Sequence, residues 1–178
     1  GADTLATGRV LAAAIARLAS QEELALVLCG QQTIDGDTAQ VGPGIATQLK
    51  LSQLTLVDRV DSVDLKARRI VLRRKLEGRH EMVESRLPAL LTVVREINRP
   101  RYPVVPRRLA AAEATVTVWN NQTLGLDPAT IGLRGSPTKV DRIFSPERTK
   151  SEIIGDGLRD PAGTADLPRR AQGGPPCA

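Results

Sequence analysis

The chain has 178 residues, of which 41% are hydrophobic and only 2% aromatic, and its formal net charge is +5. His80 is the only histidine, which argues against a His-based catalytic triad or zinc site, and two cysteines indicate neither a disulfide framework nor a metal site. The longest strongly apolar run, residues 24–29, is too short to span a membrane and suits a buried strand. We therefore expect a cytoplasmic protein without membrane insertion.

Apolar residues at the start of the chain repeat with the 3.6-residue period of a helix, which Asp3 or Thr4 can cap. Three prolines make residues 98–106 irregular. The predicted elements, in chain order, are a helix at 3–18, a strand at 24–29, a helix at 38–50, a strand at 54–60, a hairpin of strands 70–76 and 82–87, a strand at 90–94, a helical turn at 109–114 and a strand at 115–119.

The opening order of helix, strand, loop and helix is half of a doubly wound α/β domain. We predict the α/β class, with an incomplete doubly wound, Rossmann-like sheet, an antiparallel hairpin and an extended C-terminal arm. Residues 1–119 would form the α/β domain and residues 120–158 the arm. Residues 159–178, dominated by Pro, Gly and Arg, would form a disordered tail.

A polar loop at residues 30–40 connects a buried strand to a helix, where an open α/β sheet binds ligands. Its N–H groups, and those of the next helix start, can point at an anion that the helix dipole favours. Asp35 and Asp37 would repel phosphates, so we expect them to accept from ribose hydroxyls or to cap N–H groups. The loop also offers neutral donors from Gln31, Gln32, Thr33, Thr38 and Gln40. From chemistry alone, a plain strand-to-helix connection is an equally good interpretation.

The start of the second helix can be placed in two ways. Asp37 as the N-cap, with Gln40 three residues on, forms an acidic capping box and starts the helix at Thr38. A start near Gly42 would instead make Pro43 a favoured first residue. We predict the earlier start.

Six segments of the chain resemble the beta subunits of electron transfer flavoproteins and occur in that family's order. They are residues 28–43, 1–7, 76–78, 87–93, 99–103 and 131–138. The resemblance covers most of residues 1–155 and implies an adenine-nucleotide-binding sheet. The family's N-terminal portion is absent and the chain begins at Gly1, so we expect a fragment or a processed form.

The resemblance implies an electron carrier and not an enzyme. Such proteins pair with an alpha subunit that holds most of a redox-active FAD, and they pass electrons from an acyl-CoA-type dehydrogenase or NADH to a quinone reductase or ferredoxin. The beta subunit holds AMP in ordinary members and a second FAD in bifurcating and nitrogen-fixation-linked members. Because residues 1–7 look like the FAD-containing type, we favour FAD over AMP. The implied nucleotide-binding residues are Thr4, Thr7, Cys29, Gly30, Gln31, Gln32, Thr33, Asp35, Gly36, Asp37, Thr38, Ala39 and Gln40.

Partner contacts are also implied by the resemblance. The segment containing Tyr102, Val104, Val105 and Pro106 matches the position of the family's partner-recognition loop, and its prolines would lower the entropy cost of docking. Residues 124–138 resemble the part that reaches the alpha subunit. From sequence alone, a rigid surface turn explains the proline-rich segment equally well.

Two alternative hypotheses remain. A nucleic-acid-binding module would use the basic cluster of Arg68, Arg69, Arg73, Arg74, Lys75, Arg107 and Arg108. Stacking aromatics are nearly absent, however, and Glu77, Glu81 and Glu84 can pair across the hairpin, so we expect no nucleic-acid partner.

An ATP-using hydrolase or ligase would need a triphosphate loop, metal carboxylates or a nucleophile, and only Asp35 and Asp37 lie near the loop. We predict no catalytic residues and no metal.

Overall fold

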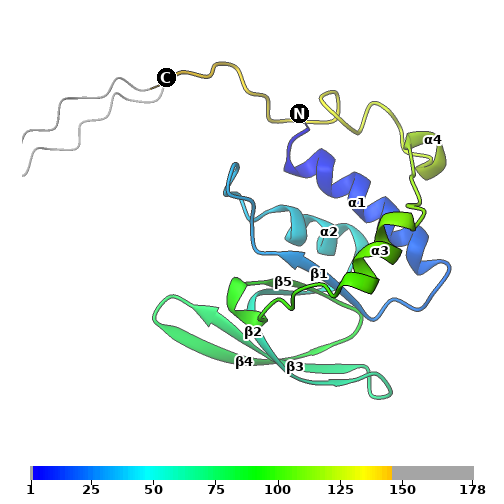
Figure 1. The fold of residues 1–178 in the computed structure, drawn as a ribbon. Coiled ribbons are helices and arrows are strands. Elements are labelled where there is room, and N and C mark those ends of the chain that lie inside the picture. The colour runs from blue at the N-terminus through cyan, green and yellow to red at the C-terminus, as the bar shows by residue number, and fades with distance from the viewer. Residues whose placement is uncertain (1, 146–178) are drawn as a thin grey trace, which may run out of the picture. The chain divides into compact units, whose positions relative to one another are not determined.

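One five-stranded sheet organises the fold of residues 2–145, the part of the chain that this computed structural model describes (Figure 1). The strands are β1 (Leu26–Gly30), β2 (Ser52–Asp64), β3 (Arg69–Leu76), β4 (Arg79–Arg86) and β5 (Ala89–Val93). The helices are α1 (Thr4–Ala19), α2 (Val41–Leu49), α3 (Val105–Glu113), α4 (Asn121–Leu124) and the short 3-10 helix η1 (Arg95–Ile97). None of these helices combines the length and apolar character that a membrane span requires.

The strand order is β1-β5-β2-β3-β4. β5 lies parallel to both β1 and β2, whereas β3 is antiparallel to both of its neighbours, β2 and β4. Gly78 turns the hairpin between β3 and β4 with a left-handed φ of 72°, which glycine adopts without steric cost. The predicted α/β class, with a Rossmann-like parallel part and an antiparallel hairpin, is therefore confirmed.

Helices α1 and α2 cover one face of the parallel strands (Figure 1). Ala12 of α1 and Ile45 and Ala46 of α2 pack on Leu90, which points to this face from β5. The predicted cap of α1 is also present, because Asp3 accepts a hydrogen bond from the Ala6 N–H at 2.9 Å. This packing places the start of both helices beside the carboxyl end of β1.

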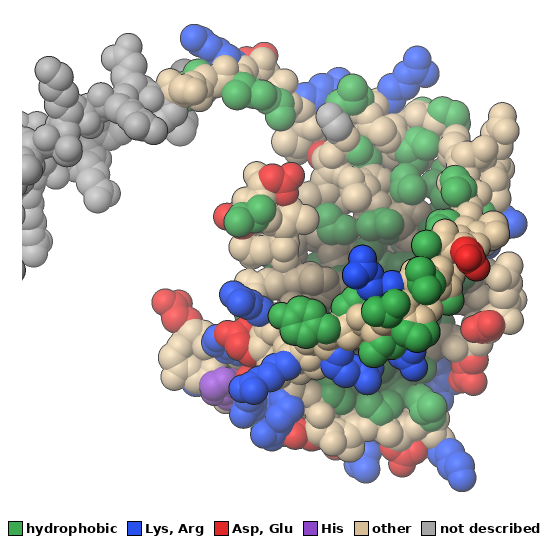
Figure 2. Space-filling model, viewed as in Figure 1, with side chains coloured by type: hydrophobic (Ala, Val, Ile, Leu, Met, Phe, Trp, Pro, Cys, Tyr) green, Lys and Arg blue, Asp and Glu red, His purple; other side chains and the backbone are tan. Residues whose placement is uncertain are grey.

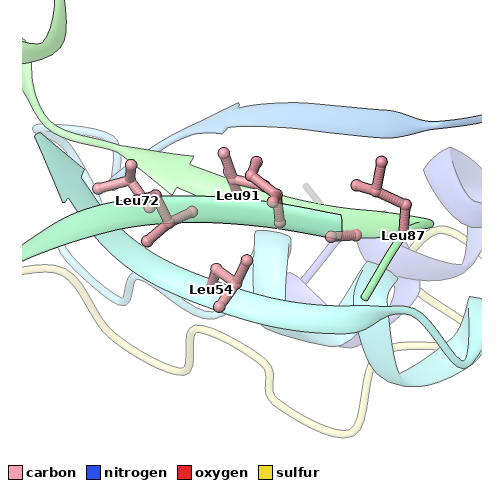
Figure 3. Close-up of a cluster of buried hydrophobic side chains, with 7 residues drawn as sticks. Leu54, Leu72, Leu87 and Leu91 are labelled. Carbon is pink, nitrogen blue, oxygen red and sulfur yellow. The ribbon is translucent and has the colours of Figure 1, made fainter. Parts of the chain in front are cut away.

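The opposite side of β5 contributes to a second core (Figure 3). Leu91 alternates with Leu90 along the strand and meets Leu54 and Leu72 from β2 and β3. Strand β2 is irregular, since Leu56 has a φ of 60° and the register with β3 shifts twice. Bulges of this kind bend a strand and increase its twist. Each fully buried leucine stabilises the fold by about 1.5–3 kcal/mol.

The prediction that α2 starts at Thr38 is wrong, because the helix begins at Val41. Asp37 and Ala39 have φ values of 49° and 52°, which a right-handed helix does not allow. The Asp37 carboxylate accepts from the Gln32 amide at 2.7 Å, so it does not form the capping box. Pro43 lies in the first turn, where its missing N–H is not needed.

Two predictions for the C-terminal half are also wrong in part. Residues 115–119 form no strand, and Val118 is 83% exposed, because no neighbouring strand pairs with this segment. Residues 98–104 are irregular as predicted, but α3 begins at Val105, since the fixed φ of Pro106 suits a first helical turn. The predicted domain boundaries stay predictions, and the predicted tail at 159–178 lies outside the described residues.

Candidate nucleotide-binding site

A pocket of about 380 Å³ lies where the carboxyl end of β1 meets the N-terminal end of α2. Small-molecule pockets typically measure about 300–1,000 Å³, so this pocket is large enough for a ligand. Nine of the residues predicted from the sequence line it: Thr7, Cys29, Gly30, Gln31, Gln32, Thr33, Thr38, Ala39 and Gln40. The structure therefore brings the first turns of α1 and the loop after β1 together around one cavity.

Four predicted residues lie outside the pocket lining. Thr4 contacts the site indirectly, because its hydroxyl donates to Gln40 Oε1 at 3.0 Å. Asp35 and Gly36 lie at the exposed tip of the loop, and Asp37 is held by Gln32. None of these four residues forms part of the lining.

Sequence reasoning missed four lining residues, which are Leu11, Val41, Gly42 and Ile45. Leu11 follows Thr7 by one helical turn, and Ile45 follows Val41 in the same way, so both pairs share a helix face. That spacing was available from the sequence. An apolar residue at helical spacing is equally typical of a hydrophobic core, which Ile45 also joins.

The loop backbone leaves amide groups available to a ligand. Within the loop, the Asp37 N–H donates to the Thr33 carbonyl at 3.0 Å. Among the described residues, the N–H groups of Thr38, Ala39 and Gln40 donate to no backbone carbonyl. A residue with left-handed backbone beside one with right-handed backbone, such as Ala39 and Gln40, exposes its amides on one side of the loop. The start of α2 contributes further N–H groups. The lining can therefore bind an anion through neutral donors.

Asp35 brings a negative charge to the exposed tip of the loop. A hydrogen bond from the Thr33 hydroxyl lowers the pKa of Asp35, and the N–H groups of Asp35 and Gly36 lower it further. The carboxylate is therefore ionised at neutral pH and repels a phosphate near the loop tip. It suits a sugar hydroxyl, which can donate to it.

Cys29 forms part of the pocket wall at the end of β1. Burial raises the pKa of the Cys29 thiol, so it stays protonated at neutral pH. Because the thiolate is the reactive form, Cys29 acts here as a small apolar wall residue.

Gly42 lets α2 start directly against the sheet. A Cβ at this position would lie 2.6 Å from Thr92 Cγ2 on β5. Any larger residue would push the start of α2 away from the carboxyl ends of the strands. The close approach therefore positions the helix amides beside the pocket.

The predicted partner-recognition residues are exposed. Tyr102 is 97% exposed and Val105 is 67% exposed, and Val104 and Pro106 are also on the surface. No residue of α3 is buried. Figure 2 shows hydrophobic side chains gathered over α3 with basic side chains beside them. An apolar surface of this kind is typical of a protein interaction site.

Charges on the hairpin are paired across the strands, as the sequence predicts. Arg69 lies 3.5 Å from Glu84, and Arg74 lies 3.7 Å from Glu81. Arg73 donates two hydrogen bonds to the buried Asp58, at 3.0 and 2.7 Å. These bonds from Arg73 lower the pKa of Asp58, so the pair is charged at neutral pH.

The fold and the pocket define an open α/β protein of the Rossmann-like class, with a polar loop at the carboxyl edge of its parallel strands. The family model described as "Electron transfer flavoprotein domain" matches residues 1–124. The chain therefore belongs to the electron transfer flavoprotein family, and its relatives show that it is a beta-type member.

Three relatives illustrate the similarity. The chain is 46% identical to the caffeyl-CoA reductase-Etf complex subunit CarD of Acetobacterium woodii, over 82% of this chain and 53% of that protein. It is 45% identical to the protein FixA of Sinorhizobium fredii, over 86% of this chain and 55% of that protein. It is 40% identical to the electron transfer flavoprotein subunit beta of Clostridium acetobutylicum, over 91% of this chain and 60% of that protein. The chain thus spans a little over half the length of these relatives.

Proposed function

We propose that this chain holds an adenine nucleotide in an electron carrier of the electron transfer flavoprotein type, with FAD as the expected nucleotide and AMP as the alternative. The pocket beside β1 carries this proposal, because nine residues that the sequence resemblance implies for nucleotide binding line it together. The similarity to FixA and CarD supports the same role. The chain would hold the nucleotide without consuming it.

The residues present fit such a nucleotide. The amides of Thr38, Ala39 and Gln40 and the start of α2 would hold phosphate oxygens. The apolar wall of Leu11 and Ile45 would pack against a flat base. Asp35 would accept from a sugar hydroxyl at the loop tip. When bound, FAD supplies the redox chemistry, and the hydrogen bonds and charges of the protein tune its potential.

Partner binding is part of the proposal. The exposed segment with Tyr102, Val104, Val105 and Pro106 would dock a redox partner, such as an acyl-CoA-type dehydrogenase. An alpha subunit that holds a further FAD would complete the carrier. Electrons would pass from a dehydrogenase or NADH toward a quinone reductase or ferredoxin, inside the cytoplasm.

The nucleotide released from the denatured heterodimer tests this function. The chain would be co-purified with its alpha subunit, denatured, and its small molecules separated by chromatography. More than one FAD per heterodimer supports the FAD-binding form, whereas one FAD with one AMP supports the alternative. One FAD per heterodimer, with no AMP and no second flavin, would show that this pocket holds no nucleotide.

A further inference from the structure

The segment that follows α4 runs back along α1 toward its N-terminal end (Figure 1). Near the end of α1, where this segment begins, Arg17 donates to the Thr123 carbonyl of α4 at 2.7 Å. Midway, Arg9 donates to the Thr130 carbonyl at 3.1 Å. The segment therefore lies antiparallel to α1 and reaches the helix start at residues 132–138.

Asp3, Ser136 and Thr138 form a set of hydrogen bonds at that end, which we call the clasp. The Asp3 N–H donates to Ser136 Oγ at 2.9 Å, and the Thr138 N–H donates to Asp3 Oδ2 at 3.0 Å. Ser136 is buried, and its hydroxyl donates to the Gly132 carbonyl at 2.6 Å. The other oxygen of Asp3 caps α1 through the Ala6 N–H. One carboxylate therefore binds both the helix start and the returning segment.

The first turn of α1 in turn borders the pocket. Thr7 lines the cavity, and its N–H donates to the Asp3 carbonyl at 3.0 Å. Thr4 donates to the side chain of Gln40, which lines the cavity from the loop. A shift of Asp3 would therefore move one wall of the pocket and release its contact with the loop.

We propose that the clasp positions the first turn of α1 for nucleotide binding, so that residues 132–138 set the affinity of a pocket they do not line. Ser136 and Thr138 act on this turn through Asp3 and are positioning residues. This inference rests on the proposed nucleotide-binding function. Because linkage between two sites is reciprocal, a bound nucleotide also stabilises the docked segment.

Isothermal titration of the full chain with AMP, and separately with FAD, tests the clasp. Asp3→Ser keeps an oxygen that can cap α1 but removes the one that accepts from Thr138. Ser136→Ala removes the acceptor of the Asp3 N–H. We expect each variant to weaken binding about three- to tenfold, as the loss of one hydrogen bond predicts. Arg17→Ala loosens the contact with α4, just before the segment begins, and should change the affinity less than about twofold.

Hydrogen exchange separates positioning from a general loss of structure. In the wild-type chain, nucleotide should slow amide exchange in residues 132–138, and Asp3→Ser should abolish that slowing. If the wild-type chain binds a nucleotide and both clasp variants bind it with the same affinity, the clasp proposal fails and the proposed function stands. If Arg17→Ala weakens nucleotide binding as much as the two clasp variants do, the clasp proposal also fails, because the effect would then be a general loss of structure. If neither AMP nor FAD binds the wild-type chain, the proposed function fails, and the clasp proposal fails with it.

Discussion

Replacing Gly42 with alanine should strain the point where α2 passes closest to the sheet. The added Cβ would lie 2.6 Å from Thr92 Cγ2. Thr92 is buried, and its hydroxyl accepts the Leu56 N–H at 3.2 Å, so it cannot rotate away without losing that bond. Overpacking costs about 1–3 kcal/mol, and the higher helix propensity of alanine offsets about 1 kcal/mol at most. With part of the Thr92 hydrogen bond lost, the free energy of unfolding should fall by about 1–2 kcal/mol.

Urea unfolding of three further variants checks this reasoning. Gly44→Ala lies in the same helix, where the new Cβ has no atom within 4 Å apart from its chain neighbours and the helix backbone, so it should be neutral or stabilising by up to about 1 kcal/mol. Thr92→Ser removes the clashing methyl group and keeps the hydroxyl. Combined with Gly42→Ala, it should recover about 1 kcal/mol relative to the sum of the single changes. Equal stability of Gly42→Ala and Gly44→Ala, or no recovery in the double variant, would refute the clash.

Three further predictions concern other parts of the fold. Because the folded-state pKa of Asp58 lies below its ordinary value of 3.8, the ion pair of Asp58 with Arg73 stabilises the fold at neutral pH, and this stabilisation is lost as the pH falls below about 4. Asp58→Asn should therefore make the free energy of unfolding depend less on pH in that range. Gly135→Ala places a Cβ 2.0 Å from the carbonyl carbon of Thr130, so limited proteolysis should cut residues 130–138 faster. Val105→Ser should slow reduction of the proposed carrier's flavin by a redox partner, while the free energy of unfolding changes by less than about 0.5 kcal/mol. Val116→Ser, at another exposed valine, is the control and should leave the reduction rate unchanged.

The pocket shows which part of a site a sequence can predict. Thr33 and Thr38 were expected in it because a polar loop between a strand and a helix of an open α/β sheet falls at a ligand-binding edge. Leu11 and Ile45 were not expected, because apolar residues at helical spacing serve a core as well as a pocket wall. Asp35 was predicted to lie at the site, and its distance from the lining depends on how the loop folds back on itself.

The sequence alone determined the elements that depend on neighbouring residues. These include α1 with its Asp3 cap, the hairpin around Gly78 and the buried strand β5. Their signals are hydrophobic period, capping and turn chemistry, all of which act within a few positions.

Only the tertiary structure decided where α2 begins, that residues 115–119 stay unpaired, and that Asp3 meets Ser136, which is 133 positions away in sequence. Local propensity cannot decide these features, because a strand needs a partner and a long-range hydrogen bond needs the whole chain in place. The left-handed backbone at Asp37 and Ala39 is likewise set by the closing of the loop around its own side chains, which overrides the capping preference of the sequence.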